Sequence, residues 1–494
     1  MALPKLSRWQ KMLLPVATLL GTAFPALAQA PQNPVIEVGV VQRFGEEPTD
    51  QLEIEPLSGD RLTVRFTTGG QPQTLTTNRL RLEIAQMPLE KAMLQERLVL
   101  SSHRSFESAE DSANQWRDRG IETEIAQPNG WEVWAKREVY QSPLLRRLLL
   151  QNLRQQGFEQ VYMDTHVVDR VPKTAFIANG YRYNRDRVVI TSANSRIRVT
   201  TGSGQRDRKL YGGSLELQPN AYGTYTLVND VPIETYLRGV VPHEIGPSAP
   251  RPAIEAQAVL ARTYALRNLR RFAIDEYQLC ADTQCQVYWG LGGTATVADQ
   301  AIAATRGQVV THNSELIDAL YSSTTGGVTA RFSDVWNGPD RPYLRSVVDS
   351  VSGVWDLSQR PLSEEQNVRA FLSLESGFNE EDWDLFRWRR ESTLADISRE
   401  LKEYLGNRQH PLAGFSAMGE LQVVERSSGG RVRRLAIQTD LGIIELEKDE
   451  IIRALYGPRS LLFYLDPLYE PVPTAAAAAE PQPEPVLKGY AFVG

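Results

Sequence analysis

The sequence is poor in the residue types that hold metals. Its 494 residues include two cysteines and five histidines, and the cysteines lie close together in CADTQC as Cys280 and Cys285. No histidine lies between His243 and His312, and two thiolates alone do not complete a tetrahedral zinc site. A close cysteine pair in an oxidising compartment usually forms a local disulfide. We therefore expect a disulfide between Cys280 and Cys285, with a zinc site as the alternative. We expect no cofactor.

The sequence also lacks an excess of positive charge and, beyond its N-terminus, any run of 18 apolar residues. With a net charge of −6, the chain has no overall positive field to attract nucleic acid. The N-terminus combines basic residues, an apolar run at 12–20 and Ala26-Leu27-Ala28, which together are typical of a secretory signal. We predict a signal peptide at 1–28, with an uncleaved anchor as the alternative, and export to the periplasm or cell envelope.

The rest of the chain divides into segments of different pattern. Residues 29–94 alternate apolar and polar residues around turns, which predicts a β-rich segment. Residues 175–360 combine short strands with an Ala-rich helix at 251–272, and 361–468 predict a further α+β part. Residues 469–494 form a Pro/Ala-rich tail whose PVPTAAAAAEPQPEP stretch cannot bury enough apolar surface to fold. The predicted fold class is α+β.

Residues 95–165 predict a small module with the element order βαββαβ. Its halves echo one another, because QWRDRGIETEI and NLRQQGFEQVY each end a helix at a glycine and begin a strand. This pattern resembles the SPOR domain, which binds peptidoglycan strands stripped of their stem peptides. The alternative is an unrelated ferredoxin-like α+β module.

Glu244 is the carboxylate that the sequence places most suggestively. It lies in PHEIGPS, a segment rich in turn-forming residues that follows an apolar run and precedes the helix at 251–272. A lone carboxylate at such a junction is a candidate acid catalyst. From the residues alone, a solvated surface glutamate is the alternative.

Several motifs in order resemble the stage II sporulation protein D / LytB family over about residues 230–356. They are VPIETYLRGVVPHEI, EAQAVLARTYAL, DTQCQVYWG, AIAATRGQVVTHNSELIDALYSSTTGG and DVWNGPDRPYLRSV. Members are peptidoglycan lytic transglycosylases or regulators of wall hydrolases. The resemblance therefore implies a SpoIID-like core and a role on cell-wall glycan.

The resemblance also implies roles for individual residues. Glu244 takes the position of the catalytic glutamate, and Arg262 matches an arginine that could hold a sugar or orient Glu244. The alternative for Arg262 is a surface salt bridge, with Glu255 at the limit of reach. Further substrate-binding candidates are Gln257, Tyr343, Arg345, Asp356 and Ser323.

One departure bears on activity. Family members usually carry a segment of the type GHGVGMSQ-GA, and none occurs in the 494 residues. Two interpretations therefore stay open. The first is a lytic transglycosylase that cleaves β-1,4 MurNAc–GlcNAc bonds of stem-peptide-free glycan strands, using Glu244 as acid and base. The second is a non-catalytic peptidoglycan-binding scaffold or amidase enhancer whose partner is a wall amidase.

Overall fold

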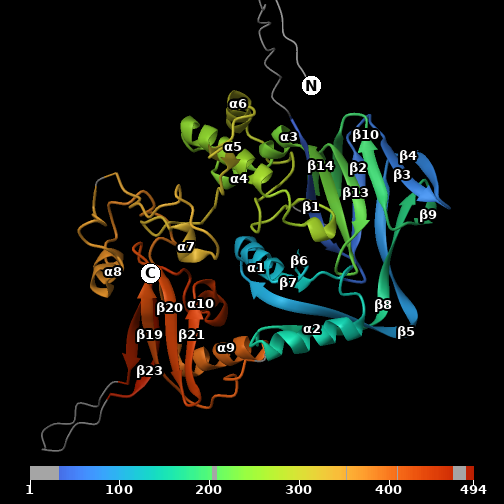
Figure 1. The fold of residues 1–494 in the computed structure, drawn as a ribbon. Helices are drawn as coiled ribbons and strands as arrows, with labels where there is room; N and C mark the ends of the chain where they lie inside the picture. The colour runs from blue at the N-terminus through green and yellow to red at the C-terminus, as the bar shows by residue number, and fades with distance from the viewer. Residues whose placement is uncertain (1–32, 203–207, 352, 409, 471–484) are drawn as a thin grey trace, which may run out of the picture.

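The structure is a computed structural model that describes residues 33–202, 208–351, 353–408, 410–470 and 485–494. Strands dominate, almost all of them antiparallel, and helices pack between and beside the sheets (Figure 1). The predicted α+β class is confirmed. The predicted signal peptide lies outside the described residues. Within them, none of the helices combines the length and apolar character that crossing a membrane requires.

A seven-stranded sheet forms the centre of the N-terminal half. Alternating side chains of its strands are buried, as with Ile36 and Val38 at 0% exposure, which is the period that one core-facing side of a sheet requires. In spatial order the strands are β15 (Leu279–Cys280), β1 (Val35–Phe44), β14 (Tyr225–Pro232), β13 (Ser214–Pro219), β10 (Val188–Ser192), β3 (Leu62–Thr68) and β4 (Gln71–Thr77).

A second sheet shares the apolar core with the first and continues into the 95–165 module. The predicted boundary between the 29–94 segment and the 95–165 module falls inside one continuous strand, β5. This strand pairs along most of its length with β8. The sheet runs β12 (Arg208–Gly212), β11 (Arg196–Thr200), β2 (Gln51–Pro56), β5 (Leu80–His103), β7 (Trp131–Ala135) and β6 (Thr123–Ala126), while β8 (Tyr162–Ala178) pairs with β5 and β9 (Tyr181–Asn184).

The 95–165 module has the predicted element order βαββαβ. Its helices are α1 (Phe106–Asp118) and α2 (Pro143–Gln155), and its strands lie in the order β8-β5-β7-β6. The hydroxyls of Ser105 and Ser142 cap the two helices by accepting backbone N–H bonds. The cap of α1 therefore lies three residues before the predicted Ser108. Likeness to the SPOR domain in particular stays a prediction.

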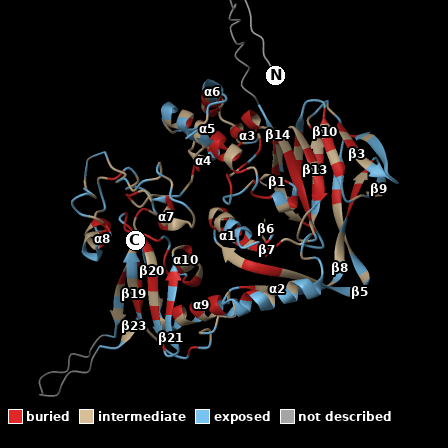
Figure 2. Cartoon of the chain, viewed as in Figure 1, coloured by how far each residue is buried: buried red, intermediate tan, exposed pale blue. Residues whose placement is uncertain are grey.

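Four helices that follow β14 cover one end of the seven-stranded sheet. They are α3 (Ile233–Arg238), α4 (Val241–Glu244), α5 (Arg251–Arg267) and α6 (Thr296–Ala304). The stripe of Ile254, Ala258, Ala261 and Ala265 on α5 is fully buried, as its helical spacing predicts. Figure 2 shows this inner face of the helices as buried. After α6, the two-residue strands β16 (Thr311–His312) and β17 (Glu315–Leu316) pair with each other.

The C-terminal part has its own sheets and apolar core. Within the predicted tail at 469–494, β23 (Leu487–Val493) is the central strand of a three-stranded sheet, while residues 471–484 lie outside the described residues. Tyr490 and Phe492 on this strand are buried. The elements are α7 (Phe332–Val335), α8 (Glu365–Leu372), α9 (Leu394–Gly406), α10 (Asp449–Ala454), the sheet β18 (Arg389–Thr393), β23 and β22 (Tyr464–Tyr469), and the sheet β19 (Met418–Arg426), β20 (Val432–Thr439) and β21 (Gly442–Glu447).

Candidate active site around Glu244

Glu244 is the last residue of the four-residue helix α4 rather than part of a loop. Val240 and Val241 just before it are fully buried, so the backbone that carries Glu244 is anchored in the core. The turn between α3 and α4 depends on Gly239, because a Cβ there would clash with the carbonyl oxygen of Gly290. The short helix therefore has one fixed position, and it presents Glu244 at its end.

The carboxyl of Glu244 is half-buried and has one backbone partner. The backbone N–H of Val287 donates to Oε1 at 2.8 Å. Burial raises the pKa of Glu244 above its ordinary value of 4.5, and the hydrogen bond from Val287 lowers the pKa by less. The environment therefore favours the protonated form, which a general acid needs.

A chain of polar side chains ends at Tyr321, close to Glu244. Tyr236 is fully buried, and its hydroxyl donates to Oε1 of Gln286 at 3.2 Å, which fixes the orientation of that amide. Nε2 of Gln286 then donates to the Tyr321 oxygen at 3.0 Å, and Nε2 of Gln257 donates to it at 3.3 Å. Burial first and the charge of Glu244 second raise the pKa of Tyr321.

This arrangement leaves Tyr321 with a proton to donate. A phenol oxygen has two lone pairs, and the amides of Gln257 and Gln286 approach it as donors. Two consecutive residues bind Tyr321 and Glu244. The side chain of Gln286 binds Tyr321, and the backbone of Val287 binds Glu244. The predicted site residue Gln257 therefore belongs to this network, whereas Tyr321 and Gln286 are additions that the sequence reasoning missed.

Arg262 does not lie where a glycan could reach it. Its side chain is 2% exposed, and Nε and Nη2 donate to the two carboxylate oxygens of Glu234 at 2.8 Å each. Nη1 donates to the carbonyl of Gln308 at 3.0 Å. Burial rules out a surface salt bridge and direct contact with a sugar, and Glu255 instead binds Arg251 at 2.9 Å. An orienting role of Arg262 toward Glu244 stays a prediction. Burial requires a fully paired guanidinium, and Glu234 on α3 supplies the pair.

Cys280 and Cys285 are joined by a disulfide. Cys280 lies on β15, which pairs in parallel with β1, and both cysteines are buried. The disulfide thus ties the start of the segment that contains Gln286 and Val287 to the sheet. Among the described residues, no group of histidine, cysteine and acidic side chains is arranged to hold a metal ion.

Two of the predicted substrate-binding residues make local contacts in the segment that follows α7. The hydroxyl of Tyr343 accepts a bond from the backbone N–H of Asp318 at 3.1 Å, and its ring lies 5.3 Å from that of His312. Arg345 is exposed, and its Nε donates to the carbonyl of Pro342 at 2.9 Å. Tyr343 is therefore held against the segment between β17 and Tyr321, while Arg345 remains at the surface.

Asp356 and Ser323 are exposed and lie outside the Glu244 network. Asp356 accepts bonds from the backbone and hydroxyl of Ser358, which explains its lowered pKa as that of a turn residue. Within the described parts of the chain, neither an ion pair nor a hydrogen bond joins Arg345, Asp356 or Ser323 to Glu244 or Tyr321. Their roles toward a substrate stay predictions.

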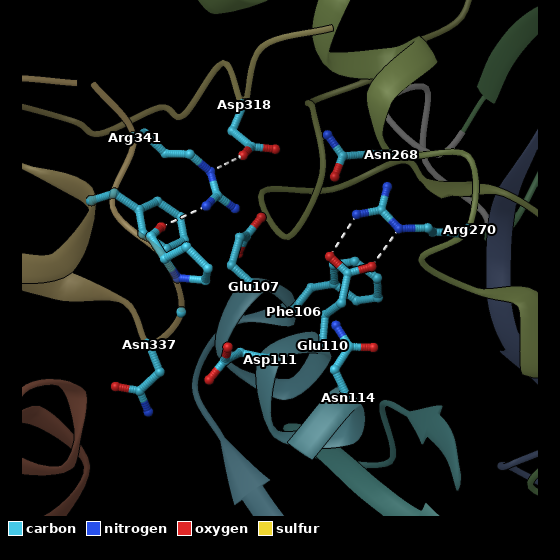
Figure 3. A pocket seen from close by; sticks show the side chains of 13 residues that line it. Phe106, Glu107, Glu110, Asp111, Asn114, Asn268, Arg270, Asp318, Asn337 and Arg341 are labelled. Atoms are coloured by element: carbon cyan, nitrogen blue, oxygen red, sulfur yellow. Dashed lines mark hydrogen bonds and ion pairs between the residues drawn. The ribbon is translucent and has the colours of Figure 1, made fainter. Parts of the chain in front are cut away.

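A pocket lies between α1 and the segment 332–341, and Glu244 is not among its lining residues (Figure 3). Its charged side chains largely neutralise one another. Nη2 of Arg270 donates to Glu110 at 2.5 Å, and Nε of Arg341 donates to Asp318 at 2.5 Å. The Arg270–Glu110 pair joins the 95–165 module to the segment after α5. We therefore interpret this region as a contact between the module and that segment.

Two family models and several relatives match parts of the chain. A family model described as "Stage II sporulation protein" matches residues 221–312, and a "Domain of unknown function" model matches 330–494. An uncharacterized protein of Brachyspira hyodysenteriae is 36% identical over 138 residues, 28% of this chain and 37% of the relative. The amidase enhancer of Bacillus subtilis is 30% identical over 167 residues, 29% of this chain and 23% of that protein.

Stage II sporulation protein D of Bacillus subtilis is 33% identical over 144 residues, which are 26% of this chain and 40% of that protein. The chain thus spans well under half the length of each of these relatives. The family match contains Glu244, Gln257, Gln286 and Val287, whereas Tyr321 lies beyond its end.

Proposed function

Because this chain belongs to the stage II sporulation protein D / LytB family through its residues 221–312, we propose that it is a lytic transglycosylase of the cell envelope. It cleaves the β-1,4 bond between MurNAc and GlcNAc in peptidoglycan glycan strands. The observation that carries the proposal is Glu244, a half-buried carboxyl with a raised pKa at a fixed position in the matched region.

The first half of the reaction needs a proton donor. Protonated Glu244 gives its proton to the glycosidic oxygen as the bond from that oxygen to C1 of MurNAc breaks. Burial of the Glu244 side chain favours the protonated carboxyl before this step. Positive charge then develops at C1, and the departing sugar leaves with a new hydroxyl.

The second half needs a base, and the same side chain supplies it. The carboxylate of Glu244 takes the proton from the C6 hydroxyl of the same MurNAc, whose oxygen bonds to C1 and closes a 1,6-anhydro ring. Glu244 is protonated again and no water is consumed. A second carboxylate, which an ordinary glycosidase uses on a water or as a nucleophile, is therefore unnecessary.

Stem-peptide-free glycan strands are the proposed substrate form. The βαββαβ module at 95–165, with its likeness to the SPOR domain, supports this proposal because such modules bind stripped strands. The ion pair between Glu110 and Arg270 holds the module against the core. A bound strand would thus be kept at the protein while Glu244 acts on it.

A non-catalytic role is the second candidate, and the similarity to an amidase enhancer favours it. In that role the chain would bind wall glycan and increase the activity of a wall amidase. The Glu244 side chain would then be dispensable. The two candidates therefore differ in their dependence on one carboxyl.

The deciding experiment digests purified stem-peptide-free glycan with the wild-type chain, Glu244→Gln and Glu255→Gln. The last variant is a matched control, because Glu255 forms an exposed pair with Arg251. We expect fragment release by wild type and Glu255→Gln, and a loss of at least about 100-fold in Glu244→Gln. No release by wild type, together with amidase stimulation that survives Glu244→Gln, would establish the second candidate instead.

A further inference from the structure

An exposed tryptophan lies next to the Glu244 site. Trp289 is 44% exposed, whereas its neighbour Tyr288 is fully buried and donates its hydroxyl to Asn229 at 2.9 Å. The backbone N–H of Trp289 donates to the carbonyl of Gly239 at 3.1 Å. The backbone is therefore fixed by the turn before α4, and the indole is held at the surface as a consequence.

Two basic residues flank this indole. Nζ of Lys209, on β12, lies 4.9 Å from the centre of the Trp289 ring, and the His243 ring lies 5.6 Å from it. Burial first and the charge of Lys209 second lower the pKa of His243, so the imidazole is neutral near neutral pH. We call Lys209, His243 and Trp289 the Trp289 cluster.

Lys209 carries a positive charge beside the exposed indole. Among the described residues, Lys209 has no carboxylate within ion-pair distance, although 33 other ion pairs occur there. Arg238 on α3, by contrast, is paired with Asp299 at 2.8 Å. An unpaired ammonium beside an exposed aromatic ring fits a ligand that has both an apolar face and a negative group.

The cluster is also close to the reacting carboxyl along two separate stretches of chain. His243 directly precedes Glu244, and Trp289 follows by two residues the backbone N–H of Val287 that binds Glu244. A chain-like ligand seated on the cluster would therefore continue toward Glu244.

We propose that the Trp289 cluster is a saccharide subsite that takes a sugar unit with a free carboxylate. The C–H face of the sugar ring contacts the indole, and the carboxylate pairs with Lys209, while His243 offers a neutral hydrogen-bonding nitrogen. The ligand class rests on the proposed function. In peptidoglycan, MurNAc has a free lactyl carboxylate only where the stem peptide has been removed, so the subsite would select stripped strands.

The test measures equilibrium binding in the full-length chain with Glu244→Gln, in which the ligand stays intact. One probe is a stem-peptide-free GlcNAc–MurNAc oligosaccharide, and the other is a chitooligosaccharide of equal length, which has no carboxylate. The variants are Trp289→Ala, Trp289→Phe and Lys209→Met. Trp383→Ala and Lys91→Met are matched controls, because Trp383 is 55% exposed and Lys91 is also exposed, and neither contacts the cluster.

We expect Trp289→Ala to weaken binding of both probes about tenfold, and Trp289→Phe to restore most of the loss. Lys209→Met should weaken only the carboxylate-bearing probe, by about five- to tenfold. Equal effects of Lys209→Met on both probes, or wild-type binding by Trp289→Ala, would overturn the subsite. Failure of the catalytic proposal appears separately, as a wild-type chain that releases no product while these binding differences persist.

Discussion

Arg262 and Glu234 form a bidentate ion pair in which both side chains are almost fully buried, at 2% and 6% exposure. The pair links α5 to α3, and Arg262 also binds the carbonyl of Gln308. Helix α3 is followed directly by the turn at Gly239 and by α4, which ends at Glu244. The pair thus ties α5 to the helix that leads into α4 and Glu244.

Removal of one partner of this pair should destabilise the chain strongly. Arg262→Met leaves the Glu234 carboxylate buried without a counter-ion, so we expect a loss of about 3–5 kcal/mol in the free energy of unfolding. The double variant with Glu234→Met should recover part of that loss. Denaturant unfolding measures both, with Arg251→Met as a control at an exposed pair. Loss of similar size in Arg251→Met would argue against this account.

Tyr321→Phe should slow the reaction, and because it leaves the buried amide of Gln286 without its acceptor, it should also cost about 1–3 kcal/mol in the free energy of unfolding. The substitution removes a hydroxyl whose proton is free to bond a substrate oxygen near Glu244, while the stacking on Tyr264 at 5.5 Å is retained. We expect the rate of glycan cleavage to fall about 10- to 100-fold. Tyr469→Phe, at an exposed tyrosine on β22, serves as the control. Turnover by Tyr321→Phe at the wild-type rate would remove Tyr321 from the site.

The raised pKa of Glu244 gives stability a specific pH dependence. Burial penalises the charged carboxylate in the folded state, so Glu244 is free of this penalty below its unfolded pKa of 4.5. The penalty grows as pH rises through the higher folded pKa. Glu244→Gln should therefore raise the melting temperature near neutral pH and leave it unchanged below pH 4.5. A difference of the same size at both pH values would contradict the burial effect.

The disulfide should matter to activity more than its small loop suggests. Replacement of both Cys280 and Cys285 by serine should cost about 2 kcal/mol in unfolding free energy, as expected for a short closed loop. Because Gln286 and Val287 follow directly, the hydrogen bond to Glu244 should also loosen. Cleavage rates measured well below the melting temperature should fall. An unchanged rate in a destabilised double variant would show that the disulfide serves stability alone.

Local patterns in the sequence account for most of the fold, and the exceptions have physical causes. The stripe from Ile254 to Ala265 depends on nearby residues, so the sequence predicts it well. The strand β23 depends on pairing with β18 and β22, which lie far from it or across a Pro/Ala-rich stretch. Seven residues after such a stretch carry no local signal for a central strand.

In the candidate site, too, residues within local motifs are predicted, whereas contacts between distant segments are not. Glu244 and Gln257 lie within motifs that resemble the family, and this resemblance is what indicates them. The partner of Arg262 is 28 residues away on another helix, and helical spacing points only to near neighbours such as Glu255. The place of Tyr321 in the site likewise cannot be predicted from nearby residues, because its hydroxyl oxygen accepts hydrogen bonds from amides on two separate segments.

The central claim is that Glu244 drives an intramolecular ring closure rather than hydrolysis. Digestion of stem-peptide-free glycan in water enriched in heavy oxygen, followed by mass analysis of the products, separates the two reactions. We predict that the wild-type chain produces 1,6-anhydro ends, which lack one water and carry no heavy oxygen. Glu244→Gln should not produce them. Product ends that contain the heavy oxygen would contradict it.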